Sequence, residues 1–290
     1  MKVFLAEYSG FCFGVKRAIK IAFQTAKRGH VPVYTYGSLI HNPQAVQELE
    51  KKGVKPIQSL SDIRKGTVII RSHGVPPKIM SEAKSRGITV VDATCPFVRK
   101  AQELAFSLGS QGYQVVVVGE ADHPEVKGIL GHAGDRAVVL DYRDNDPRLR
   151  IASRKIGVIA QTTLLLDKFQ SVISTLLEIA TELKIYNTIC SATTLRQEST
   201  LNLAEEVDLM IVLGGKNSAN TSRLAELCRS VGKRTYHIET AKELDPAWFR
   251  NSHKLGITAG ASTPDWIIED VIDLIGAGAE HTVLRGRAFH

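Results

Sequence analysis

Residues 89–108 read TVVDATCPFVRKAQELAFSL, and this stretch decides the fold class. A short β-branched run ends in the polar turn DATC, whose last residue is Cys95. Beyond the cysteine, apolar residues recur at the three- and four-residue steps of an amphipathic helix: Val98, Ala101, Leu104, Ala105 and Leu108. The stretch therefore predicts a strand, a polar exit that ends in cysteine, and a helix.

This pattern of strand, cysteine and helix occurs three times in the chain. Residues 2–12 (KVFLAEYSGFC) and 184–190 (KIYNTIC) run in the same way into Cys12 and Cys190. After each cysteine comes a second strand pattern with a polar exit: VYTYGSLIHNP (33–43), QVVVVGEADHPEVKG (114–128) and LMIVLGGKNSANTSR (209–223). A third follows: TVIIRSHGV (67–75), IGVIAQTT (156–163) and LGITAGAST (255–263). Nine polar exits in three sets of three predict three similar units whose strand ends converge on one place.

Strand patterns alternate with helical stripes along the whole chain, which predicts an α/β fold. The runs VVVVG (115–119) and LMIVLGG (209–215) are continuously apolar, as strands covered on both faces are. This alternation predicts parallel sheets with right-handed crossovers. In such sheets ligands bind beyond the carboxyl ends of the strands, and the polar exits lie there.

The composition is that of an ordinary globular protein, with 43% hydrophobic and 23% charged residues. No apolar run approaches the roughly 20 residues that span a bilayer, and the start MKVFLAEYSG lacks the features of a signal peptide. We therefore expect a cytoplasmic protein with reduced thiols and no membrane partner. The net charge of +7 favours an anionic partner. Because only 6% of residues are aromatic, we expect a phosphorylated metabolite and not nucleic acid.

A cysteine that ends a strand and precedes a helix is suited to bind metal, because the helix N-terminus stabilises its thiolate. Any one such cysteine can instead be a buried structural residue. Three at equivalent positions favour a metal centre with an open coordination position. An iron–sulfur cluster is the first interpretation, and zinc with three cysteines and water is the second. Cys228, at helical spacing from Leu224 in RLAELCRS, is predicted to pack in a core.

Histidines stand at three of the polar exits, each beside Pro or Gly: His41, His73 and His123. A lone histidine is more often a surface or structural residue, but the matching positions predict a shared site. Histidines there can bind phosphate oxygens or shuttle protons. Glu125 follows His123 at the start of a predicted helix, where an acid is favoured in any case. Beside a metal and histidines it is a candidate general acid.

Hydroxyl and amide side chains occupy the remaining exits: Thr162 and Thr163 in AQTT, Ser218 and Asn220 in KNSAN, and Ser262 in GAST. Each precedes a predicted helix, so helix capping is the simplest role. Several helix N-termini with hydroxyl groups also form a cradle for an anion such as a diphosphate. The sequence has no GxxxxGK[ST] loop and no strand-linked GxGxxG, so the ordinary modes of nucleotide binding are not supported.

Taken in order, the motifs resemble those of the LytB family. They are GFCFGVKRAI, IHNPQAVQELEKKGV, SHGVPP, DATCPFVRKAQ, HPEVKGILG, AQTTL, ICSAT with the following RQ, KNSANTSRL and TAGASTP, between about residues 5 and 275. The resemblance implies a 4-hydroxy-3-methylbut-2-enyl diphosphate reductase, which acts last in the non-mevalonate isoprenoid pathway. It also implies three α/β units in a pseudo-threefold arrangement around a central [4Fe–4S] cluster.

The resemblance also assigns roles to individual residues. Cys12, Cys95 and Cys190 match the cluster ligands. Glu125 matches the acid that supplies the proton needed to expel water, and Thr162 matches the hydroxyl that orients the substrate oxygen. The residues that match diphosphate-binding positions are His41, His73, His123, Ser218, Asn220 and Ser262. His123 also matches a residue that helps to deliver protons.

Domain boundaries follow from the cysteines and the resemblance together. They are 14–95, 96–190 and 191–280, with strand 1–13 completing the third unit and 281–290 as a tail.

Two positions depart from the family pattern. Ala219 replaces a serine of the common NSSN, and Ser191 stands where a larger residue is frequent. Ala219 removes a hydroxyl donor, which bears on affinity more than on the type of reaction.

The chain carries no flavin or nicotinamide motif, so a reductase of this kind needs an external electron donor. The resemblance implies a ferredoxin or a flavodoxin, and a basic surface suits such acidic partners. Two interpretations from other classes stay open. One is a metal-bearing sensor that binds an isoprenoid-like phosphate without turnover, but it has no use for Glu125 or Thr162. The other is an RNA-associated protein, which rests on net charge alone.

Overall fold

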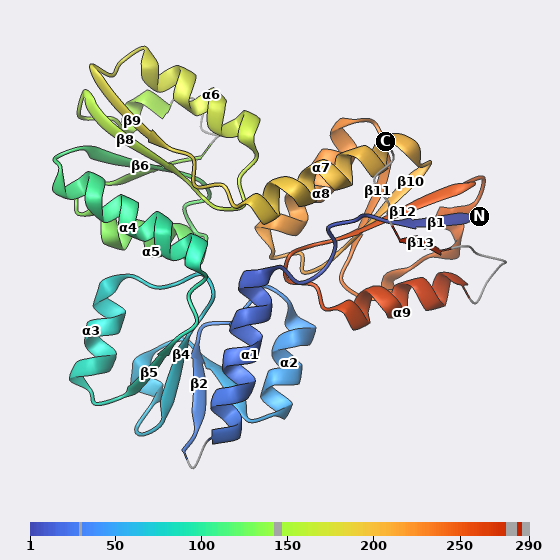
Figure 1. Cartoon of the computed structure of the whole chain (residues 1–290), viewed down its shortest axis with the longest axis horizontal. Helices are drawn as coiled ribbons and strands as arrows, with labels where there is room; N and C mark the ends of the chain where they lie inside the picture. Colours follow the sequence, from blue (N-terminus) through green and yellow to red (C-terminus); the bar gives the residue numbers. More distant parts are fainter. Residues whose placement is uncertain (29–30, 142–146, 277–282, 286–290) are drawn as a thin grey trace. The chain divides into compact units, whose positions relative to one another are not determined.

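The computed structural model describes residues 1–28, 31–141, 147–276 and 283–285. It contains three separate β-sheets, and every strand pair in them is parallel (Figure 1). Helices connect successive strands, as parallel pairing requires. The predicted α/β fold with three similar parts is therefore confirmed.

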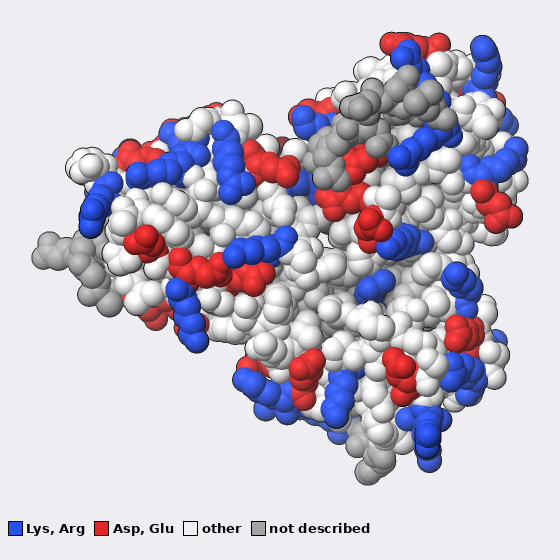
Figure 2. Space-filling view, turned by 180° about the vertical axis from the view of Figure 1, so that it is seen from behind, with Lys and Arg blue, Asp and Glu red and all other residues white. Residues whose placement is uncertain are grey.

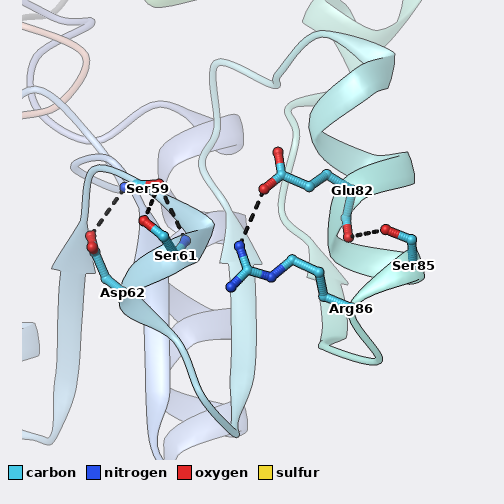
Figure 3. Close-up of polar contacts among 6 residues, drawn as sticks. All are labelled: Ser59, Ser61, Asp62, Glu82, Ser85 and Arg86. Atoms are coloured by element: carbon cyan, nitrogen blue, oxygen red, sulfur yellow. Dashed lines mark hydrogen bonds and ion pairs between the residues drawn. The ribbon is translucent and has the colours of Figure 1, made fainter.

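The first sheet along the chain has four strands. In sheet order they are β3 (Val54–Ile57), β2 (Val33–Tyr36), β4 (Thr67–Ile70) and β5 (Thr89–Asp92). The helices of this part are α1 (Phe13–Arg28), α2 (Pro43–Lys51) and α3 (Pro77–Ser85). A short 3-10 turn, η1 (Leu60–Asp62), follows β3. A capping box fixes its start (Figure 3). The Asp62 side chain accepts a hydrogen bond from the Ser59 N–H, and the Ser59 side chain accepts one from the Ser61 N–H.

The second sheet also has four strands. In sheet order they are β7 (Val138–Leu140), β6 (Gln114–Val118), β8 (Lys155–Ala160) and β9 (Glu182–Tyr186). Its helices are α4 (Pro96–Ser110), α5 (Pro124–Ala133) and α6 (Leu166–Leu177), and η2 (Pro147–Arg150) precedes β8. Val115 and Val117 lie in one buried cluster with residues of α4 and α5. Val116 and Val118 lie in another with residues of α6, so the continuous apolar run is covered on both faces, as predicted.

The third sheet joins the two ends of the chain. In sheet order its strands are β11 (Arg234–Ile238), β10 (Leu209–Leu213), β12 (Lys254–Ala259), β1 (Lys2–Leu5) and β13 (Val283–Arg285). Its helices are α7 (Ser191–Glu206), α8 (Ala219–Ser230) and α9 (Asp265–Gly276), with η3 (Ala241–Glu243) and η4 (Pro246–Phe249) before β12. Of the predicted tail, 281–290, the structure describes only β13, which pairs with β1.

All three sheets share one strand order, in which the second strand comes first, followed by the first, third and fourth strands of the unit. In the third sheet β1 takes the fourth place beside β12. The chain direction across the sheet switches between the first and third strands, and such switch points are where open α/β sheets bind ligands. In each sheet the predicted substrate residues follow these two strands, and the cysteine follows the fourth.

By packing, the chain divides into two compact units. One comprises Met1–Val15, His41–Ala45 and Ser191–His290, and holds the third sheet. The other comprises Lys16–Ile40 and Val46–Cys190, and holds the first two sheets. The division into 14–95, 96–190 and 191–280 with strand 1–13, and the pseudo-threefold arrangement around a cluster, stay predictions.

Charges of both signs are mixed on the protein surface. On the face drawn in Figure 2, Lys and Arg side chains are interspersed with Asp and Glu. Among the described residues, no helix is both long enough and apolar enough to cross a membrane.

Candidate active site

Each of the three cysteines is held by the same main-chain hydrogen bond. The N–H of Cys12 donates to the carbonyl of Ala261 at 3.0 Å, and that of Cys95 donates to Ser72 at 2.9 Å. The N–H of Cys190 donates to Thr162, also at 2.9 Å. Each acceptor is the second residue after the third strand of its sheet. The three cysteines are thus structurally equivalent, as their sequence positions predict.

The same three cysteines differ from the fourth in exposure and in setting. Each directly precedes a helix, because α1, α4 and α7 begin at the next residue, and each is partly exposed. Cys228 is fully buried among apolar side chains of α7, α8 and β10, which confirms its predicted packing role. Burial raises the pKa of the Cys228 thiol to about 12. The chain therefore offers three accessible thiols and one inert one.

Glu125 and Thr162 form a buried pair in the second sheet. Glu125 lies in the first turn of α5, and Thr162 follows β8. The main-chain N–H of Thr162 donates to Glu125 Oε1 at 2.6 Å, and its hydroxyl donates to Oε2 at 2.8 Å. The two residues are only 2% and 5% exposed, so water does not compete for these bonds. The carboxyl group is fixed in one orientation at the predicted site.

Two of the predicted histidines lie next to this pair. His123 is the N-cap of α5, where its Nδ1 accepts a hydrogen bond from the Glu125 N–H at 3.2 Å. A neutral His123 therefore carries its proton on Nε2. The ring of His73 meets that of His123 edge to face, with centroids 5.5 Å apart. The second compact unit thus brings Glu125, Thr162, His123 and His73 together, as the sequence predicts.

His41 lies in the other compact unit, with Ser262. The Ser262 hydroxyl donates to the His41 main-chain carbonyl at 2.9 Å. A Cβ at Gly215 would stand only 2.7 Å from the same carbonyl, so this position needs glycine. In this structure Ser262 therefore positions the backbone of His41. That His41 shares a site with the two histidines of the second unit stays a prediction.

Ser218 and Asn220 mark the start of α8. Ser218 is the N-cap, and its side chain accepts a hydrogen bond from the Thr221 N–H at 3.4 Å. Asn220 is only 5% exposed, and neither polar atom of its amide has a hydrogen-bond partner among the described residues. A buried amide without partners is costly unless a ligand completes it. Ala219, the departure from the family pattern, is buried between them and contributes no hydroxyl.

The sequence analysis missed two buried amides. Gln161 is fully buried, and it accepts a hydrogen bond from the Glu120 N–H at 3.0 Å and donates one to Thr163 at 3.2 Å. It joins the exits of β6 and β8, on which His123 and Thr162 stand. Asn42, 1% exposed, caps α2 by accepting from the Ala45 N–H at 2.8 Å. Gln161 lies in the motif AQTTL and Asn42 in the motif IHNP, and their place in these motifs was the one sequence signal for them.

Relatives of known sequence cover almost the whole chain. A family model described as LytB protein matches residues 3–276. The 4-hydroxy-3-methylbut-2-enyl diphosphate reductase of Pelobacter propionicus is 51% identical over 276 residues, which cover 95% of this chain and 98% of the relative. The protein of the same name from Geobacter sulfurreducens is 50% identical, with coverage of 95% and 97%.

Solved structures agree with this. One, of (E)-4-hydroxy-3-methyl-but-2-enyl diphosphate reductase, described as the terminal enzyme of the non-mevalonate pathway, is 46% identical with a TM-score of 0.71. It matches 96% of this chain and all of its own. The E-1-hydroxy-2-methyl-but-2-enyl-4-diphosphate reductase of Plasmodium falciparum is 25% identical with a TM-score of 0.92, over 100% of this chain and 93% of its own. The resemblance of the motifs is confirmed, and the chain belongs to the LytB family.

Proposed function

We propose that this protein is a 4-hydroxy-3-methylbut-2-enyl diphosphate reductase, which forms isopentenyl and dimethylallyl diphosphate. The relatives that cover nearly all of the chain carry this name. The observation that carries the proposal is the buried Glu125–Thr162 pair beside His123 and His73. A carboxyl group held at both oxygens in a dry site is suited to proton transfer.

The reaction takes up two electrons and two protons. The allylic C–O bond breaks, the hydroxyl leaves as water, and a hydrogen is added to the carbon skeleton at one of two positions, which gives the two products. In this structure both Glu125 oxygens accept hydrogen bonds from Thr162. Glu125 must therefore take up a proton before it can act as the acid. The Thr162 hydroxyl can donate and accept at once, so it can orient the substrate oxygen while it touches Glu125.

The diphosphate group is the proposed partner of the start of α8. Asn220 offers a buried amide to which no described residue is hydrogen-bonded, and the first N–H groups of a helix favour an anion. Ser218 stands at the N-cap of the same helix. We also assign Ser262, His41, His73 and His123 to diphosphate binding, on the strength of the family motifs. His123 presents Nε2–H as a donor because its Nδ1 already accepts.

Cys12, Cys95 and Cys190 are the proposed ligands of a [4Fe–4S] cluster. Three partly exposed cysteines at helix N-termini fit this group, since the helix start stabilises each thiolate. The fourth cysteine is buried in a core and cannot complete the set. When bound, such a cluster would pass on the two electrons one at a time and would supply an iron with an open coordination position.

Electrons then have to come from a separate protein, and we propose a ferredoxin or a flavodoxin. A net charge of +7 favours an acidic partner of this kind. We propose the cytoplasm as the location of this chain, because thiols stay reduced there and can bind a cluster.

Turnover by the purified protein tests the proposal. The protein is prepared without oxygen, reduced with a chemical donor, and given 4-hydroxy-3-methylbut-2-enyl diphosphate. We expect both isopentenyl and dimethylallyl diphosphate, formed together with water. Tight binding of the substrate without either product would instead indicate a sensor. Failure of an iron-loaded protein both to bind and to convert it would overturn the proposal.

A further inference from the structure

Two arginines each join the helix that follows one cysteine to the turn that precedes another cysteine. Arg17 lies on α1, the helix that begins directly after Cys12. Its Nη1 donates to the main-chain carbonyl of Thr94 at 3.1 Å. Thr94 is buried and stands immediately before Cys95. Arg17 therefore ties the helix that follows one cysteine to the turn that carries the next.

Arg196 makes the corresponding contact in the other compact unit. It lies on α7, the helix that begins directly after Cys190, and is only 4% exposed. Its Nη2 donates to the carbonyl of Gly10 at 2.7 Å, and its Nη1 donates to the carbonyl of Ala192 at 3.1 Å. Gly10 is the second residue before Cys12. One guanidinium thus joins the first turn of α7 to the turn that carries Cys12.

The two contacts form a directed series. The helix after Cys190 holds the turn of Cys12, and the helix after Cys12 holds the turn of Cys95. We propose that Arg17 and Arg196 are positioning residues, which fix the main-chain turns of two metal-binding cysteines. Nothing in the comparisons assigns these residues such a role. The metal-binding part of this inference rests on the proposed function, but the positioning of the turns does not.

Physical reasons favour positioning over a purely stabilising role. The bonds from Arg17 to Thr94 and from Arg196 to Gly10 both end on main-chain carbonyls, so each fixes the backbone of a turn. Gly10 has φ +81°, a conformation that leaves its carbonyl outside any regular ladder. A charged donor makes a stronger hydrogen bond than a neutral one, so it suits such an isolated carbonyl.

Hydrogen exchange of the metal-free protein tests the positioning directly. In Arg17→Met, we expect the amides of Ala93 and Cys95 to exchange about 10-fold faster or more. In Arg196→Met, we expect this of Gly10 and Cys12 instead. Each variant serves as the control for the other, because it leaves the other turn tied. Faster exchange throughout the chain, or unchanged exchange in both turns, would overturn the inference.

Iron retention tests the consequence for the metal. With a chelator, we expect both variants to lose cluster absorption about 10- to 100-fold faster than the unaltered protein. Lysine should restore most of the retention at position 17, where one bond is made, and less at position 196, where a guanidinium spans two carbonyls. Equal retention in all variants would contradict the inference. If the unaltered protein held no cluster, the proposed function would fail while the exchange result still decided the positioning.

Arg86→Met provides the matched control. Arg86 is the C-cap residue just after α3 and pairs with Glu82 of that helix at 3.3 Å, on the surface (Figure 3). It is an arginine of the second compact unit, like Arg17, but its bond does not reach a cysteine turn. We expect exchange at all three cysteine turns, and iron retention, to be unchanged in this variant. A loss as large as that in Arg17→Met would overturn the assignment.

Discussion

Thr162 holds both carboxylate oxygens of Glu125, one through its main-chain N–H at 2.6 Å and the other through its hydroxyl at 2.8 Å. The residues are 37 positions apart and come from the two strand exits that flank the switch point of the second sheet. The hydrogen bond from the Thr162 N–H fixes where the carboxyl group lies. The Thr162 hydroxyl, which makes the second bond, can also contact a substrate. We therefore expect proton delivery to depend on both residues.

Replacing Glu125 with Gln should abolish proton delivery while keeping the size of the side chain. We expect turnover to fall by at least about 100-fold, because general acid catalysis contributes on that scale. The iron content and the binding of substrate should stay close to normal. Steady-state kinetics with an artificial reductant, together with iron analysis, would measure both.

The control for this change is Asp122→Asn. Asp122 lies in the same GEADHPE segment, but its side chain is fully exposed and pairs with Lys127 at 3.2 Å. Its turnover should match that of the unaltered protein. Equal losses in the two variants, or normal turnover in Glu125→Gln, would remove Glu125 from the proton path.

Thr162→Val should separate the two hydrogen bonds of the pair. It keeps the main-chain N–H and removes the hydroxyl, so Glu125 stays near its place but loses one charge-assisted bond. We expect kcat to fall about 10- to 100-fold. Thr162→Ser, which keeps a hydroxyl, should recover most of it. A valine variant as active as the serine variant would mean that only the backbone bond matters.

Asn220→Ala should change affinity and stability in opposite directions. Its buried amide has no hydrogen-bond partner in the described part of the chain, so removing it relieves a desolvation cost and raises the unfolding free energy of the ligand-free protein, by up to about 1 kcal/mol. The diphosphate loses a donor, so the dissociation constant should rise about 10-fold or more. Calorimetric binding and thermal unfolding measure the two. Ser230→Ala, at the far end of α8, is the control and should change neither.

Alkylation should distinguish the four cysteines of the metal-free protein. Burial raises the pKa of Cys228 to about 12, so at pH 8 only about one thiol in 10,000 is ionised, and the thiol is also shielded. Cys12, Cys95 and Cys190 are partly exposed. Mass spectrometry after brief iodoacetamide treatment should show three modified sites, and the fourth only after unfolding. Early labelling of Cys228 would contradict its place in the core.

Local patterns made most of the architecture predictable. The β-branched run before Cys95 and the helical stripe after it each depend on neighbouring residues, so sequence spacing reports them directly. The same holds for the apolar runs at 115–118 and 209–213, which form β6 and β10. The position of each cysteine between a strand and a helix followed from these elements.

Contacts through space were less predictable, and α7 shows why. The apolar stripe after Cys190 is weak because the buried face of this helix is largely polar: Thr193, Arg196, Thr200 and Ala204. Thr200 is hydrogen-bonded to Thr258 of β12 at 2.7 Å, and Arg196 reaches Gly10. Periodicity of apolar residues cannot reveal a face that is satisfied by hydrogen bonds. The hydrogen bond from Ser262 to the His41 backbone was not predicted either, because it joins residues 221 positions apart.

The most direct test of the account is the iron and sulfide content and the absorption spectrum of protein purified without oxygen, with and without 4-hydroxy-3-methylbut-2-enyl diphosphate. We predict about four irons per chain and a broad band near about 400 nm that changes when the diphosphate is added. A colourless protein with about one zinc per chain, and no response to the diphosphate, would contradict the account.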